Sequence, residues 1–211
     1  MVISMNNRAM PYVMGALTLI PLGGTIYRLT EIINTGHWTF DFNPQIVDRL
    51  PLFLHGIGMA LFLVLGAFQF SAKLRARRPA LHRKMGRIAG LGAILGGLTG
   101  IWMTLLHLEI STPLLIGGRL LFGSAMVIFT VLAIRAAMHR RLIDHQNWII
   151  RAYAIALAAG TLPFIFAPMY LILGDVSQLE NDVIQVAGWM INLAIAEKFF
   201  VKSPISKGTI A

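Results

Sequence analysis

Residues 85–107 read MGRIAGLGAILGGLTGIWMTLLH, and this stretch decides the fold class of the chain. It contains a single Lys or Arg residue, Arg87, and no acidic residue. A helix needs about 20 apolar residues to cross about 30 Å of hydrocarbon, so the stretch has the length of a membrane span. It also lacks the polar stripe that a helix on the surface of a soluble protein shows. The stretch therefore predicts a transmembrane helix.

Other apolar runs of similar length surround this one, at residues 10–31, 50–72, 113–137, 148–173 and 183–201. The chain is 56% apolar and 13% charged, with a mean hydropathy of +0.71, whereas a soluble domain carries about 25% charged residues. Backbone polar groups find no water in lipid, so apolar spans must be helical. We expect an all-α fold in which residues 1–211 form one domain, a polytopic six-transmembrane-helix bundle.

The basic residues predict the orientation of this bundle. Most of the 18 Lys and Arg residues fall near the N-terminus, in the loops at 73–87 and 135–151, and in the C-terminal tail. The opposite side carries most of the nine acidic residues. Because cytoplasmic loops are enriched in Lys and Arg, this bias places both termini and both basic loops in the cytoplasm. The net charge of +9 then indicates topology and affinity for anionic phospholipid, and it does not indicate nucleic-acid binding.

Two kinds of residue predict how the helices pack and bend. Glycines recur at four-residue spacing in the stretch 85–107, as in Gly92, Gly96 and Gly100. Small residues at this spacing let another helix approach closely, and a flat ligand against the same face is the alternative. Within 148–173, Pro163 and Pro168 predict a bend.

Two motifs stand at the entrances to the third and fifth runs. HRKMGR occupies residues 82–87, and HQNWIIRAYA occupies residues 145–154. Together with His55 in the second run, LPLFLHGIGMALFLVLGAFQF, these motifs resemble the bacterial predicted membrane proteins that share a domain of unknown function numbered 2306. The resemblance covers about residues 50–173. It implies a multi-span protein of the bacterial inner membrane, without an established activity.

His82 and His145 lie at the predicted cytoplasmic starts of two helices. Helix N-termini carry unsatisfied amides and a positive dipole end, and Arg83, Arg87 and Arg151 add charge there. Two helix starts that attract anions are thus predicted side by side. Three kinds of ligand remain as alternatives for this site. The first is an anionic lipid headgroup, and the second is an acceptor oxygen of a phosphate, a carboxylate, a heme propionate or a quinone. The third is a heme iron bound by the histidine pair.

His55 lies about one and a half turns inside the outer end of the second run, where an ionisable group is costly. Such a residue faces a cofactor, a cavity or a partner, or else it is a neutral histidine hydrogen-bonded to a neighbouring helix. His107, at the outer end of the third run, is the candidate to share a heme b iron with His55. Counting helical rise from the connecting loop leaves the two histidines offset by roughly 7 Å.

Charged residues near the outer face form another group, and we expect them to pair across helices and close the bundle there. A transport pathway is the less favoured alternative, because no carboxylate or lysine lies at mid-membrane in the sequence. These residues are Arg28, Glu31, Glu109 and Arg119.

Two functional hypotheses of different class follow. The first is a membrane redox module that binds heme b or a quinone, alone or as a subunit of a larger membrane complex. The second is a non-catalytic accessory subunit that binds anionic phospholipid and a protein partner. The sequence has no cysteine, which excludes thiolate metal sites, and no HExxH or GxSxG motif. Whether the protein is an enzyme therefore stays open.

Overall fold

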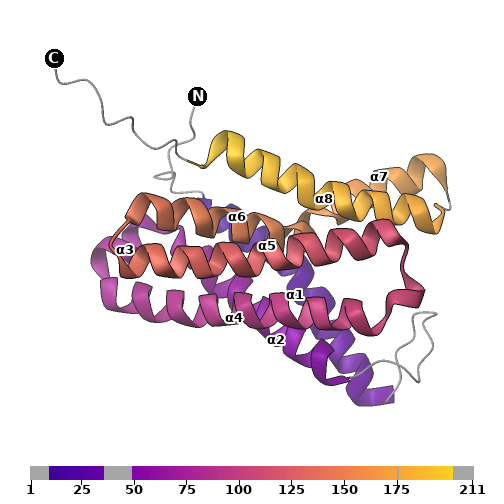
Figure 1. Ribbon diagram of the computed structural model, residues 1–211, viewed down its shortest axis with the longest axis horizontal. Coiled ribbons are helices and arrows are strands. Elements are labelled where there is room, and N and C mark those ends of the chain that lie inside the picture. Colours follow the sequence, from indigo (N-terminus) through magenta and orange to yellow (C-terminus); the bar gives the residue numbers. More distant parts are fainter. Residues whose placement is uncertain (1–9, 36–48, 175, 202–211) are drawn as a thin grey trace.

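The computed structural model describes residues 10–35, 49–174 and 176–201, and within these residues every regular element is a helix. In chain order these are α1 (Met10–Thr35), α2 (Arg49–Gln69), α3 (Ala72–Arg77), α4 (Pro79–Leu106), the short 3-10 helix η1 (Leu108–Ile110), α5 (Pro113–Met138), α6 (Leu142–Thr161), α7 (Pro163–Leu173) and α8 (Gln178–Phe199). The long helices run back and forth (Figure 1). The short helix α3 and the α5–α6 turn therefore share one end of the bundle, called here the α3 end. The α4–α5 connection and the α7–α8 turn share the other, the η1 end.

Four stretches among the described residues are long and apolar enough to cross a membrane. They are Leu50–Gln69, Pro79–Leu106, Pro113–Met138 and Leu142–Ile172. Helix α1 contains a shorter apolar stretch, Tyr12–Tyr27, and α8 is not one of the four. An all-helical protein with several apolar helices is thus confirmed, whereas a count of six spans stays a prediction.

Among the pairs of helices that touch, α2 and α4 have the most extensive contact. A methyl group added to Gly92 would lie 2.7 Å from the carbonyl oxygen of Gly58, and one added to Gly58 would lie 2.7 Å from the amide nitrogen of Gly96. Only glycine permits such a close approach of two backbones. Gly97 serves the contact with α5, where an added methyl would lie 2.5 Å from Val127 Cγ2. The interpretation of these glycines as packing residues is confirmed.

The core between α2 and α6 is aromatic. The ring of Tyr153 meets the rings of Phe62 and Phe70 edge-on, with centroids 5.5 and 5.1 Å away. Its hydroxyl donates to the carbonyl oxygen of Leu63 over 2.8 Å, and Gly66 leaves the space that the ring fills. A buried tyrosine hydroxyl needs such a partner, so this bond sets α6 against α2.

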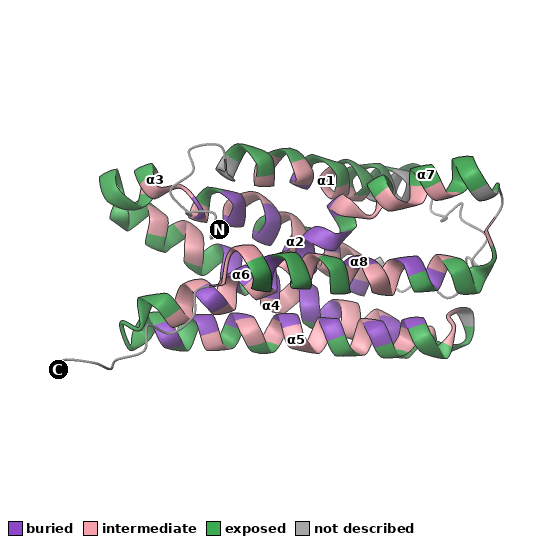
Figure 2. Ribbon diagram, turned by 90° about the horizontal axis from the view of Figure 1, so that it is seen from above, coloured by how far each residue is buried: buried purple, intermediate pink, exposed green. Residues whose placement is uncertain are grey.

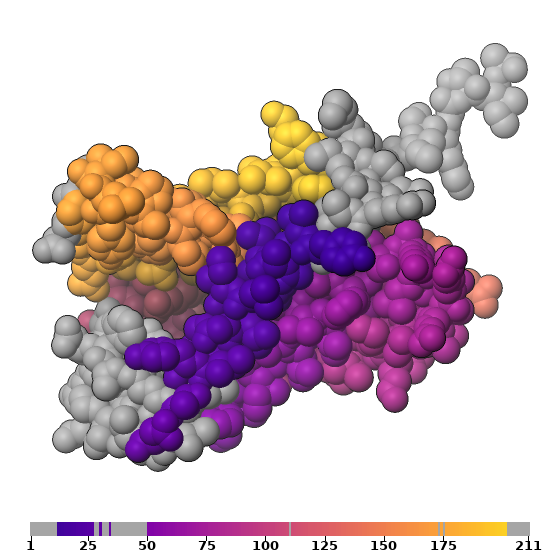
Figure 3. All heavy atoms as spheres, turned by 180° about the vertical axis from the view of Figure 1, so that it is seen from behind, coloured from indigo at the N-terminus to yellow at the C-terminus, as the bar shows by residue number. Residues whose placement is uncertain are grey.

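Helix α1 completes the bundle from one side. Seen from behind, it lies between the α7–α8 side and the α2–α4 side (Figure 3). Its backbone at Leu17 approaches Gly160 of α6 so closely that a methyl group there would overlap the Leu17 carbonyl. Most of α1, α3 and α7 is exposed, while buried residues gather on α2, α4, α5 and α6 (Figure 2).

The helix starts at the α3 end differ from the predicted ones. Helix α4 begins at Pro79, not at residue 85, and α6 begins at Leu142, not at residue 148. Proline suits the first position of a helix, so α4 starts as soon as Pro79 allows. The apolar runs marked only the part of each helix that suits hydrocarbon. His82 and His145 consequently lie within the first helical turns.

The fifth apolar run is divided into two helices at the first of its two prolines, and the predicted bend itself stays a prediction. Helix α6 ends at Thr161, and Pro163 begins α7 at a position where its missing N–H is tolerated. Helix α7 continues through Pro168.

Candidate functional site

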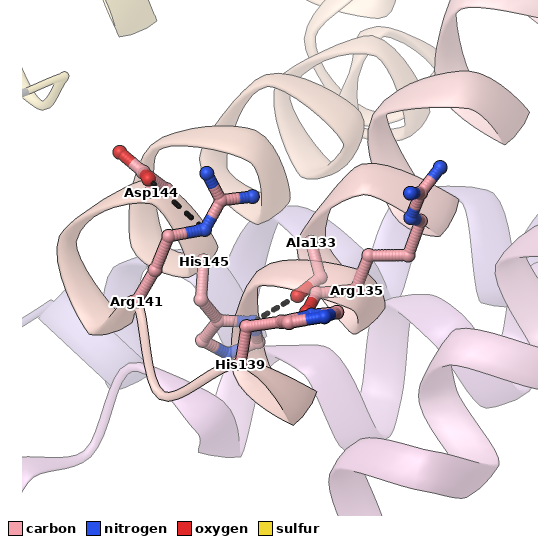
Figure 4. Close-up of polar contacts among 6 residues, drawn as sticks. All are labelled: Ala133, Arg135, His139, Arg141, Asp144 and His145. Atoms are coloured by element: carbon pink, nitrogen blue, oxygen red, sulfur yellow. Dashed lines mark hydrogen bonds and ion pairs between the residues drawn. The ribbon is translucent and has the colours of Figure 1, made fainter.

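His145 is held in a defined orientation between α6 and α5. Its Nδ1–H donates to the carbonyl oxygen of Ala133 over 2.9 Å (Figure 4). A carbonyl oxygen only accepts, so Nδ1 carries a proton and Nε2 points away from this bond. The ion pair between Arg141 and Asp144, 3.7 Å apart, lies beside it at the start of α6 (Figure 4).

His82 lies in the first turn of α4, near His145 of α6. The charges of Arg75 and Arg83 reach it too, so α3, α4 and α6 bring these groups together. Within the described part of the chain, the Nδ1 atom of His82 is shielded from solvent and has no hydrogen-bond partner. A buried polar group left unpaired costs about 1–3 kcal/mol, which a bound group can recover. When Nδ1 carries a proton, the ligand atom that fits this basic setting is an oxygen that accepts a hydrogen bond.

The three arginines of the predicted anion site separate in the structure. Arg83 and Arg87 are exposed at the start of α4. Arg151 instead points to α8, where Glu197 accepts hydrogen bonds from its Nε and, over 3.0 Å, from its Nη2. Its guanidinium also lies 4.7 Å from the ring centroid of Trp148. Because this two-pronged pair neutralises Arg151, its charge serves the α6–α8 contact, and of the three arginines Arg83 is the one near His82.

The HQNWIIRAYA motif ties α6 to three neighbours. His145 bonds to α5, and Trp148 stacks on Phe129 of the same helix with centroids 5.4 Å apart. Arg151 pairs with α8, and Tyr153 bonds to α2. The motif therefore has a structural role in addition to any ligand, and Tyr153 and Glu197 are contributors that the sequence reasoning did not single out.

His55 is hydrogen-bonded to a neighbouring helix. Its Nδ1–H donates to the Gly96 carbonyl oxygen over 2.8 Å, and a methyl group on Gly100 would lie 3.3 Å from its Cε1 atom. The ring therefore lies against α4 at the level of these glycines. His107 follows the end of α4, with Nδ1 4.0 Å from the Glu109 carboxylate, about 10 Å of helical rise beyond Gly100. The two histidines therefore lie at different levels along α4, and a shared iron stays a prediction.

A small cavity opens between α1, α6 and α8, with a volume of about 60 Å³. Ligand pockets usually measure about 300–1,000 Å³, so this cavity is too small for a porphyrin or a quinone ring. It is lined by Met14, Phe70, Ile150, Tyr153, Ala154, Asn192, Ile195, Ala196 and Phe200.

A buried polar cluster closes the η1 end. Asp182 of α8 is only 4% exposed and accepts hydrogen bonds from the Thr112 hydroxyl, over 2.7 Å, and from the Thr112 amide, over 3.3 Å. The charge of Arg119 interacts with this carboxylate, and the Arg119 guanidinium donates to Ser111 over 3.1 Å. Since a buried carboxylate needs such partners, the cluster fastens the start of α5 to α8.

The expected pairing among the outer charges stays a prediction, because within the described residues Arg119 bonds to Ser111 and is near the charge of Asp182, which was not anticipated. Glu109 lies beside His107, and both residues belong to the connection between α4 and α5. The side chains of Arg28 and Glu31 lie outside the described residues.

A family model described as Predicted membrane protein (DUF2306) matches residues 52–200. The chain belongs to this family. The match reaches beyond the resemblance at 50–173 and takes in α8, whose Glu197 receives the arginine of the HQNWIIRAYA motif. No curated protein and no solved structure matches the chain. Membership of DUF2306 supports the membrane location, and its description states no activity.

Proposed function

We propose that this DUF2306 protein is a membrane redox module that binds a quinone between His82 and His145 at the α3 end. The observation that carries the proposal is the shielded Nδ1 atom of His82, which has no hydrogen-bond partner among the described residues and lies near His145. A quinone carbonyl oxygen accepts a hydrogen bond from an imidazole N–H. The nearby Arg75 and Arg83 favour the negative charge that develops on this oxygen during reduction. The module acts alone or within a complex whose other subunits supply or receive the electrons.

Heme b is the second candidate cofactor for a redox module, and the hydrogen bonds of two histidines favour it. Iron-ligating histidines usually donate their other ring N–H to a carbonyl or carboxylate, which orients the ligating nitrogen. His145 and His55 both donate Nδ1–H to a backbone carbonyl in this way. His145 and His55 lie in different parts of the bundle. They would therefore not bind the same iron, and each would need a different second ligand.

The proposal includes an orientation, in which six spans cross the bacterial inner membrane and the α3 end faces the cytoplasm. Its support is the distribution of charge, because exposed Lys and Arg gather at the α3 end, while Glu109, Glu180 and Asp182 lie at the η1 end. A reporter fused after Ala211 should then signal cytoplasm, and one inserted within 36–46 should signal periplasm. Reversed signals would contradict the orientation.

The ligand is tested on protein purified in mild detergent. An organic extract is assayed for quinone by chromatography, and an absorption spectrum is recorded before and after dithionite for heme. We expect quinone with the parent chain and with His139→Ala, and its loss in His82→Ala. His139 is the matched control, because it is exposed at the same end and its ring bonds to the Arg135 carbonyl of its own helix.

Two other results have defined meanings. A sharp reduced band that disappears in His145→Ala would assign heme b in place of quinone. If neither cofactor accompanies protein whose circular dichroism is fully helical, the redox proposal fails. The accessory-subunit hypothesis would then account for the site.

A further inference from the structure

A dense set of exposed cations covers the α3 end. We call it the basic surface and define it by Arg75 and Arg77 of α3, Arg83 of α4, and Arg135, Arg140 and Arg141 at the α5–α6 turn. The helix α3, the start of α4 and the α5–α6 turn all lie at the same end of the bundle (Figure 1). Of the six, only Arg141 forms an ion pair with a carboxylate within the described residues, and that carboxylate is Asp144. The surface therefore has an excess of positive charge that the described chain does not neutralise.

Arg140 occupies a backbone position that suits glycine. Its φ is +58°, in the left-handed region, which costs a residue with a side chain conformational energy. The amides of Arg140 and Arg141 bond back to the carbonyls of Ala137 and Ala136 over 3.0 and 2.8 Å, so Arg140 ends α5 where glycine is the usual residue. An arginine at such a position indicates a use for its charge, because a glycine would make the same turn more easily.

Large apolar side chains are interleaved with these arginines. Met138 is 76% exposed and Leu142 is 63% exposed, and Ile143 follows them on the exposed side of the turn. Such side chains suit the boundary between lipid headgroups and acyl chains, where they enter the apolar layer while guanidinium groups stay among the phosphates. A nucleic acid or an acidic protein would offer the negative charge without that apolar layer.

We infer that the basic surface binds the headgroups of anionic phospholipids, with Arg140 as a principal contact. Each Lys or Arg near an anionic membrane surface strengthens binding by about five-fold. The inference goes beyond the proposed redox function and does not depend on it, because its principal contact, Arg140, has no part in the proposed quinone site, although the two sites share Arg75 and Arg83.

The test uses the full chain in detergent and Arg140→Gly as the informative variant. Delipidated protein is mixed with equal amounts of phosphatidylglycerol and phosphatidylcholine, and the retained lipids are counted by native mass spectrometry. We expect a preference for phosphatidylglycerol, and Arg140→Gly should lower phosphatidylglycerol retention about five-fold with phosphatidylcholine unchanged. Arg140→Lys should retain the preference.

Arg140→Gly removes the charge but relieves the backbone, so its melting temperature should equal or exceed that of the parent chain. A loss of lipid together with intact folding therefore supports the inference. Equal retention of the two lipids by the parent chain would overturn it, as would unchanged phosphatidylglycerol retention in Arg140→Gly. Displacement of phosphatidylglycerol by a short oligonucleotide at equal charge concentration would also overturn it, in favour of a nucleic-acid surface.

Discussion

Substitution of Gly92 by alanine should separate α2 from α4 and destabilise the protein. The added methyl would lie 2.7 Å from the Gly58 carbonyl oxygen, 2.9 Å from Leu61 Cβ and 3.1 Å from the Phe62 amide. Two of these atoms belong to the backbone and cannot rotate away. Ordinary contact begins at 3.4 Å, so the helices must move apart by about 0.7 Å.

The displacement has a calculable cost. Overpacking a core usually costs about 1–3 kcal/mol. One turn further along α4, the bond between His55 and the Gly96 carbonyl, now 2.8 Å, would lengthen to about 3.5 Å and lose its contribution of about 0.5–1.5 kcal/mol. Together these terms predict a loss of about 2–4 kcal/mol, or a melting temperature lower by about 5–15 °C.

The assay is thermal unfolding in detergent, followed by intrinsic fluorescence, with Gly117→Ala as the matched control. Gly117 lies on α5, and an added methyl there meets nothing within 4 Å. Alanine is the better helix former, so the control should melt at the parent temperature or slightly above it. If Gly92→Ala and Gly117→Ala melt together, the backbone contact between α2 and α4 is not as close as described, and the reasoning fails.

Other predictions concern the charged contacts. Asp182→Asn should destabilise the protein by about 1–3 kcal/mol in chemical denaturation, because it weakens the buried hydrogen bonds that the carboxylate accepts from Thr112. Glu197→Gln should cost only about 0.5–1 kcal/mol in the same assay, since the carboxylate is partly exposed, and a loss above 3 kcal/mol would contradict this. Hydrogen bonds from the Ser177 hydroxyl and amide hold the pKa of Glu180 below its usual range, so the folded pKa is lower than the unfolded one. The stability that this capping interaction gives the folded protein is present at a pH above the unfolded pKa of Glu180. It is lost as the pH falls through the folded pKa. Amide exchange at the start of α8 should accelerate on that acidification, and Glu180→Gln should abolish the pH response.

The apolar runs predicted most of the fold because lipid imposes a simple rule on composition. A helix that crosses hydrocarbon must be long and apolar, so the second to fifth runs coincide with apolar helices. The spacing of Gly92, Gly96 and Gly100 predicted a close helix contact for the same kind of reason, since only small residues permit it. The early starts of α4 and α6 did not follow from this rule, because their first turns are polar.

The partners of the site residues could not be predicted, because they come from distant parts of the chain. Arg151 and Glu197 are 46 residues apart, and Thr112 and Asp182 are 70 apart. Apolar periodicity shows which residues share a helix but not how neighbouring helices are rotated and shifted. His55 and His107 illustrate this limit. Counting helical rise along the hairpin gave an offset in depth between them, but only the contact of His55 with Gly96 shows where the His55 ring lies on α4. The helix starts around His82 and His145 were predictable as a pair, because both follow a basic loop on the same side.

The central claim is that His82 and His145 bind a redox ligand, and the most direct measurement is the molar ratio of quinone to protein in the purified chain. The account predicts a ratio near one for the parent chain, with a loss of at least about ten-fold in His82→Ala, because the hydrogen bond made by a shielded imidazole has no substitute there. A ratio in the parent chain equal to that of protein-free detergent micelles from the same membranes would contradict the claim. So would an unchanged ratio in His82→Ala.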